Sequence, residues 1–142
     1  MNNNYNNSKK FFNYIMDFNY KIIKDQFTND IMIIKYDNKE LKCKYLQIFT
    51  SYDDKIFWSD SNPYIDQKTQ FVSYTIKKYL ENSNQYNYNK INDNDIKKII
   101  NLIIKSDLKI KYYNEEINLL CVVTENTSEY KQFYLITELI YF

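Results

Sequence analysis

Apolar residues follow two different spacings along this chain, and the spacings predict its elements. They recur every three or four positions from Ser8 to about Asp25, over 66–81 and over 94–106, which predicts about three helices. Runs rich in β-branched and aromatic residues predict six strands. These strands cover residues 31–36, 41–49, 55–59, 108–113, 117–124 and 131–141. Their order favours an α+β fold whose strands form antiparallel meanders.

Short polar segments separate these elements. Asp37-Asn38 and Asp53-Asp54 are typical of tight turns between strands. Residues 82–92, rich in Asn, are expected to form an exposed loop, and residues 1–7 a disordered polar tail. The chain is therefore expected to hold one α+β domain over residues 8–142.

A shift of 76 residues aligns the two halves of the chain. It places Lys35-Tyr36 on Lys111-Tyr112 and Phe57 on Phe133. The match suggests two α-β-β-β half-repeats, 8–62 and 93–142, joined by helix 66–81. Chance matching in a biased alphabet is the alternative, and the sequence leaves both open.

The C-terminal strand carries apolar side chains on both of its faces. Phe133 and Leu135 share one face, while Tyr134, Ile140 and Phe142 share the other. Such a strand is either sandwiched inside the protein or covered by a partner. Core packing is the first interpretation. The alternative is an interface formed by Phe133, Tyr134, Ile140 and Phe142, in a homo-oligomer or with another protein.

The absence of two residue types limits the kinds of catalytic and phosphate-binding site that this chain can form. The sequence has no Gly and no His, so glycine-built phosphate loops and His-based nucleophile pairs are excluded. The acidic clusters Asp53-Asp54, Glu115-Glu116 and Asp93-Asn94-Asp95 fit turns and a helix N-cap better than a metal site. We therefore expect a non-enzymatic protein without a cofactor or a metal. Cys43 and Cys121 lie in apolar strands and are expected to be buried thiols.

Lysine supplies every basic side chain, and the net charge is only +1, so contact with nucleic acid would need a local patch. Lys42 and Lys44 share a strand face, as do Lys109 and Lys111 beside Tyr112. The outer face of the third helix adds Lys97, Lys98 and Lys105. Together they suggest phosphate contacts and base stacking, while solvated surface lysines are the simpler alternative. Without Arg, DNA binding would be salt-sensitive and sequence-nonspecific.

The N-terminus lacks the apolar segment of a signal peptide, and no apolar run approaches 18 residues. An intracellular protein that is neither secreted nor in a membrane is therefore expected.

An excess of Asn, Ile, Lys and Tyr, with no Gly or Arg, is typical of AT-rich coding sequences. In this respect the chain resembles small proteins of giant DNA viruses of amoebae and their mobile genetic elements. The resemblance implies a virion or genome-associated component, located in the host cytoplasm or the virion. The resulting expectation is a DNA-associated viral protein that contacts phosphates through Lys and Tyr, and the alternative is a protein–protein or self-assembly module.

Overall fold

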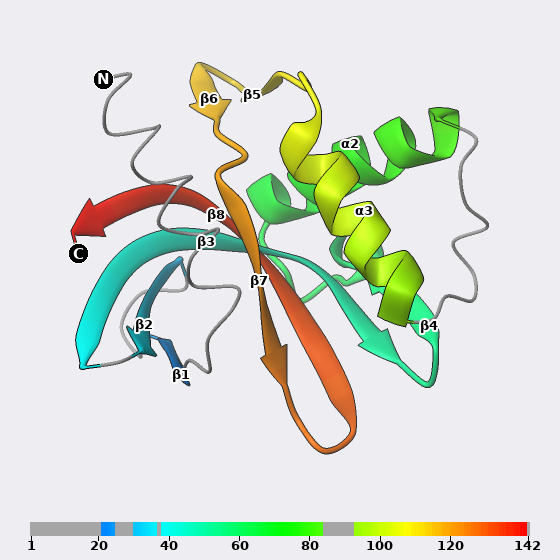
Figure 1. The fold of residues 1–142 in the computed structure, drawn as a ribbon. Coiled ribbons are helices and arrows are strands. Elements are labelled where there is room, and N and C mark those ends of the chain that lie inside the picture. Colours follow the sequence, from blue (N-terminus) through cyan, green and yellow to red (C-terminus); the bar gives the residue numbers. More distant parts are fainter. Residues whose placement is uncertain (1–20, 25–29, 37, 84–92, 142) are drawn as a thin grey trace.

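A strongly bent antiparallel sheet forms the centre of the computed structural model, which describes residues 21–24, 30–36, 38–83 and 93–141 (Figure 1). The main path of the sheet runs in the order β1-β2-β3-β8-β7, and β4 pairs with the far end of β3. Its strands are β1 (Lys21–Lys24), β2 (Ile31–Tyr36), β3 (Lys39–Tyr52), β4 (Lys55–Trp58), β7 (Cys121–Asn126) and β8 (Tyr130–Tyr141). A separate hairpin joins β5 (Ile110–Tyr112) to β6 (Glu115–Ile117).

Two helices, α2 (Gln67–Asn82) and α3 (Asp93–Lys105), lie against one face of this sheet (Figure 1). A short 3-10 helix, η1 (Ser59–Ser61), leads from β4 towards α2. Asp66 caps α2 by accepting a hydrogen bond of 2.9 Å from the backbone N–H of Thr69. The buried Ser73 hydroxyl then donates to the carbonyl of Ile48 at 2.8 Å, which fixes α2 on β3.

Buried residues form one core on each face of the sheet. The helix-side core joins α2 and α3 to the sheet, and its centre is a stack of Phe49 on Phe133 with ring centroids 4.3 Å apart. The far-side core lies on the opposite face and includes Met32, Cys43 and Tyr134. Because β3 and β8 supply residues to both cores, these two strands are apolar on both faces, as the sequence predicts for the C-terminal strand.

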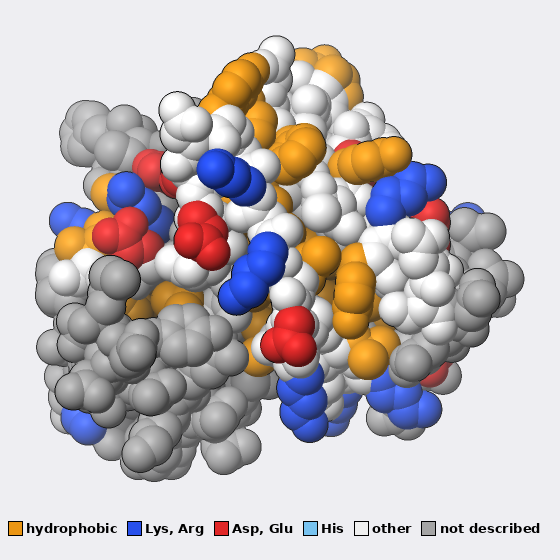
Figure 2. All heavy atoms as spheres, turned by 90° about the horizontal axis from the view of Figure 1, so that it is seen from above, with side chains coloured by type: hydrophobic (Ala, Val, Ile, Leu, Met, Phe, Trp, Pro, Cys, Tyr) orange, Lys and Arg blue, Asp and Glu red, His pale blue; other side chains and the backbone are white. Residues whose placement is uncertain are grey.

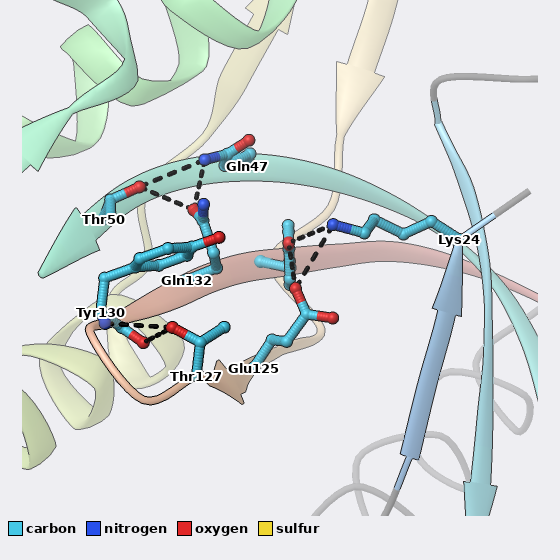
Figure 3. Close-up of polar contacts among 8 residues, drawn as sticks. Lys24, Gln47, Thr50, Glu125, Thr127, Tyr130 and Gln132 are labelled. Atoms are coloured by element: carbon cyan, nitrogen blue, oxygen red, sulfur yellow. Dashed lines mark hydrogen bonds and ion pairs between the residues drawn. The ribbon is translucent and has the colours of Figure 1, made fainter. Parts of the chain in front are cut away.

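The sheet bends so far that its two outer strands are in contact. Lys24 Nζ in β1 lies 3.3 Å from a carboxylate oxygen of Glu125 in β7. The same ammonium donates to the Tyr134 hydroxyl at 3.1 Å, and that hydroxyl donates to Glu125 at 2.9 Å (Figure 3). The far-side core is therefore enclosed by a sheet whose edges are bridged by one polar cluster.

The expected α+β class and antiparallel pairing are confirmed, but the expected number of helices is wrong. Two α-helices occur among the described residues, and Lys21–Lys24, at the end of the first predicted helix, forms a strand instead. Ile22 pairs with Ile34 and packs on the far-side core, so tertiary pairing overrides a local spacing that also suits a helix. Residues 8–20 and 25 of that predicted helix lie outside the described part.

The other elements lie close to their predicted positions. The helices predicted over 66–81 and 94–106 are α2 and α3. At both ends, α2 lies one residue later than predicted and α3 one residue earlier. The strand predicted over 117–124 is divided, because β6 pairs with β5 while β7 pairs with β8. The tail 1–7 and most of the loop 82–92 lie outside the described residues, and the duplication of 8–62 and 93–142 stays a prediction.

Candidate functional site

The lysines singled out in the sequence fall into two separate groups. Lys42 and Lys44 lie in the first half of β3, on the opposite side of the molecule from α3 (Figure 1). Lys44 Nζ is 3.5 Å from the Glu138 carboxylate. The structure therefore does not join the β3 lysines and the α3 lysines into one surface.

The second group lies on and after α3. Lys97, Lys98 and Lys105 are exposed on the outer face of the helix, and Lys109 and Lys111 are exposed beyond it. Within the described part of the chain, none of these five lysines forms an ion pair. Each lysine of α2, by contrast, has a partner. The α2 pairs are Lys68–Glu115 at 2.6 Å, Lys77–Asp60 at 3.8 Å and Lys78–Glu81 at 3.2 Å.

Acidic residues balance this second group in number. Segment 93–116 contains five Lys and five Asp or Glu, so its net charge is zero. In the view from above, basic side chains lie scattered among acidic and apolar ones instead of forming one continuous area (Figure 2). Tyr112 is half-buried, with its ring 5.6 Å from that of Phe71 and 4.6 Å from that of Tyr113.

Residues predicted at a C-terminal interface differ in exposure. Phe133 and Tyr134 are each 1% exposed and belong to the two cores. Ile140 is exposed near the end of β8, and Phe142 lies outside the described residues. The buried pair is thus not accessible to a partner, which agrees with core packing as the first interpretation.

A group of exposed aromatic side chains lies elsewhere, where β4, β3 and β8 meet. We call it the aromatic end face, and it comprises Tyr52, Phe57 and Tyr130 with Gln47, Thr50 and Gln132. Tyr52 and Tyr130 are direct partners across β3 and β8, while Thr50 pairs with Phe57 on one side and with Gln132 on the other. Partners across antiparallel strands project from the same face of a sheet. The alternate residues Phe49 and Trp58 pack into the helix-side core, so the aromatic end face points away from the helices.

Hydrogen bonds hold the polar centre of this face in one arrangement. Thr50 Oγ1 donates to Gln132 Oε1 at 2.6 Å, and Gln47 Nε2 donates to both Thr50 Oγ1 at 3.2 Å and Gln132 Oε1 (Figure 3). The surrounding rings stay accessible, since Tyr52 is 52%, Phe57 53% and Tyr130 37% exposed. Fixed amide groups and exposed rings therefore lie side by side on one sheet face.

Carboxylates border the aromatic end face at both hairpin tips. Asp53 and Asp54 follow Tyr52 in the β3–β4 turn, with φ of 52° and 60°, and Glu129 precedes Tyr130 in the β7–β8 turn. Among the described residues, Lys55, opposite Tyr52, adds one basic group to this face. Three acidic groups and one basic group give the face a net charge of −2 (−3 + 1 = −2).

The Lys24–Tyr134–Glu125 cluster lies beside the aromatic end face, because Glu125 is the β7 partner of Gln132. Burial, reinforced by the hydrogen bond and charge of Glu125, raises the pKa of the Tyr134 hydroxyl far above its ordinary value. This hydroxyl is therefore protonated at neutral pH and acts as a structural bridge.

Sequence reasoning missed the aromatic end face, although one signal was present. Ile56-Phe57-Trp58 is apolar throughout a short strand, so alternation places the Phe57 ring on the opposite face of the sheet from Ile56 and Trp58. Tyr130 joins the aromatic end face only because β8 pairs with β3, and no local sequence pattern reveals this pairing.

The described residues form neither a metal-binding cluster nor a membrane-spanning helix. They contain no group of three or more His, Cys, Asp or Glu side chains positioned to hold a metal ion. Neither of the helices they form has the length and apolar character needed to cross a membrane.

In comparisons with known proteins, no family model, no curated protein and no solved structure matches this chain.

Proposed function

We propose that this chain is a protein-interaction module that binds another protein through the aromatic end face. The observation that carries the proposal is the gathering of Tyr52, Phe57 and Tyr130 on one open sheet face, around hydrogen-bonded Gln and Thr side chains. Tyr and Phe are enriched at the centres of protein interfaces, where they bury large areas at low entropic cost.

The charges around this face also favour a protein partner. Asp53, Asp54 and Glu129 would repel the phosphates of a nucleic acid, whereas protein interfaces commonly surround an aromatic centre with a charged rim. The Gln47–Thr50–Gln132 network is already ordered, so binding would cost little additional side-chain entropy there.

Co-purification with a matched control tests this proposal. A tagged chain would be purified from its own cells as the wild type, as Phe57→Ser/Tyr130→Ser and as Tyr64→Ser. Tyr64 is a suitable control because it is 94% exposed and lies outside the aromatic end face. We expect a defined partner to be reduced at least about tenfold by the double substitution, as for loss of interface aromatic side chains, and kept by the control.

The three proteins should first show matching thermal unfolding, because the substituted side chains are partly exposed. Equal recovery of every protein by the wild type and the double variant would contradict the proposal.

Nucleic-acid association remains the second candidate function, favoured by the exposed lysines of α3, which form no ion pair with any described residue. Lys97, Lys98 and Lys105 lie on one outer helix face and would contact phosphates without base readout. Fluorescence anisotropy with single- and double-stranded DNA at two salt concentrations tests it. Binding that weakens with salt and with Lys97→Gln/Lys98→Gln/Lys105→Gln would support this function, and absence of binding at low salt would exclude it.

A further inference from the structure

We infer that the partner at the aromatic end face is a second copy of this chain, which docks through the lysines of its α3 helix. This inference rests on the proposed function and names the occupant of the same surface. Its basis is a match of charge and location between two surfaces that lie on opposite faces of one sheet.

The outer face of α3 and the aromatic end face carry charges of opposite sign. The outer face of α3 presents Lys97, Lys98 and Lys105, none of them in an ion pair within the described part of the chain. Asp53, Asp54 and Glu129 likewise form no ion pair among the described residues, and they give the aromatic end face its net charge of −2 (−3 + 1 = −2). Two surfaces with unpaired charges of opposite sign attract and orient one another.

Lysine side chains are also suited to a surface that combines aromatic rings with carboxylates. Lysine carries an apolar stem that packs on aromatic rings while its ammonium reaches a nearby carboxylate. The ammonium also interacts favourably with the face of a Tyr ring. Tyr52 and Tyr130 offer such rings directly beside Asp53 and Glu129. From Lys97 to Lys105 the helix rises about 12 Å, which matches a surface a few strands wide.

Location determines what kind of assembly results. The α3 helix packs on the helix-side core, against one face of the sheet (Figure 1). The aromatic end face lies on the other face, because its residues alternate along the strands with Phe49 and Trp58 of that core. Contact between the two surfaces is therefore head-to-tail, and each added copy leaves one free surface of each kind. Heterologous contacts of this type build open chains or closed rings.

Charge reversal in two complementary variants tests the inference with the purified full chain. Variant A is Lys97→Glu/Lys98→Glu/Lys105→Glu, which makes the α3 face acidic. Variant B is Asp53→Asn/Asp54→Asn/Glu129→Lys, which changes the charge of the aromatic end face from −2 to +2 (0 + 2 = +2). Asn is chosen because Asp53 and Asp54 have positive φ, and Asn tolerates that conformation.

Light scattering at low salt provides the measurement. The wild type is expected to grow beyond a dimer as concentration rises and to dissociate at high salt. Variants A and B alone should associate at least about tenfold more weakly, since several rim pairs become repulsive. An equal mixture of A and B should recover the association, because the A helix then faces the B surface with opposite charges. Lys109→Glu/Lys111→Glu, which leaves the α3 face intact, should associate like the wild type.

Any other outcome of the light-scattering experiment would overturn the inference. A strict monomer at every concentration, or association that A and B retain unchanged, excludes this contact. Weakening without recovery in the mixture shows that the two surfaces do not meet. The proposed function would still hold if, in the co-purification experiment, the Phe57→Ser/Tyr130→Ser variant no longer retains a partner other than this chain. Failure of the self-association inference can therefore be distinguished from failure of the proposed function.

Discussion

Tyr134 combines two roles in one side chain. Its ring is buried in the far-side core, 5.1 Å from the ring of Tyr45 in edge-on contact. Its hydroxyl reaches the edge of that core and joins Lys24 to Glu125. An aromatic residue with a polar end suits a place where apolar packing meets a polar cluster.

Replacement of Tyr134 by Phe should keep the ring and remove the bridge. We expect the free energy of unfolding to fall by about 1 kcal/mol at neutral pH, the usual contribution of such hydrogen bonds. Because folding raises the pKa of this hydroxyl, the wild type should lose stability as pH rises above about 10, the ordinary tyrosine value. Urea unfolding at neutral and alkaline pH should show a smaller alkaline loss in Tyr134→Phe. Equal losses would contradict the assigned role.

Cys43 and Cys121 illustrate how burial controls reactivity. Loss of hydration raises the pKa of each thiol to about 12, so almost no thiolate exists at neutral pH. We expect alkylation by iodoacetamide at pH 8 to be at least about a hundredfold slower in the folded chain than in denaturant. Mass spectrometry over time measures this ratio, and rapid labelling of the folded protein would refute it.

At the scale of elements, the clearest local signal is the turn between β3 and β4. Asp53 and Asp54 both have positive φ, the conformation that a two-residue hairpin turn of type I′ requires. The sequence predicts this turn without any knowledge of the rest of the fold. Helix α2 is predictable for a similar reason, since the Asp66 cap and the spacing of Val72, Ile76 and Leu80 are local features.

Substitution at the second turn position should affect stability with opposite signs. Asp54→Gly is expected to stabilise the chain by about 0.5 kcal/mol, because Gly adopts positive φ without steric cost. Asp54→Ala should destabilise it by about 1 kcal/mol, because Ala lacks the local hydrogen bonding that lets Asp adopt this conformation. Thermal unfolding of both variants provides the test. A destabilising Gly together with a neutral Ala would contradict the turn geometry.

Strand β1 shows the limit of local reasoning. Ile22 and Ile23 fit both a helical stripe and a strand, and only pairing with Ile34 and Ile33 of β2 selects the strand. Division of the segment 117–124 has a similar origin, because Ile117 pairs with Ile110 while Cys121 pairs with Ile136. Such choices depend on partners that the local sequence does not contain.

At the scale of the whole molecule, the pairing of β3 with β8 places the candidate site. It brings Tyr52 beside Tyr130 and Thr50 beside Gln132, across more than half the length of the chain. The apolar faces of the C-terminal strand indicate that it is central, yet the sequence contains no signal for this register. For the same reason, lysines that appear related in the sequence, such as Lys44 and Lys97, lie on different parts of the surface.

Closure of the bent sheet should depend on the bridge between its outer strands. Lys24→Met, Glu125→Gln and their combination form a double-mutant cycle across β1 and β7. We expect a coupling of about 0.5 kcal/mol that shrinks at high salt, because both side chains are partly exposed. Urea unfolding of the four proteins measures it. Strict additivity at low salt would show that this pair does not help to close the sheet.

The claim that the aromatic end face contacts another protein is tested most directly by site-specific photo-cross-linking. A benzophenone side chain at Phe57, which is half-exposed on that face, is compared with the same group at the fully exposed Tyr64. Position 57 should give discrete adducts, including adducts of two copies of this chain, and position 64 should give none of these. The same adducts from both positions, or none from position 57, would contradict it.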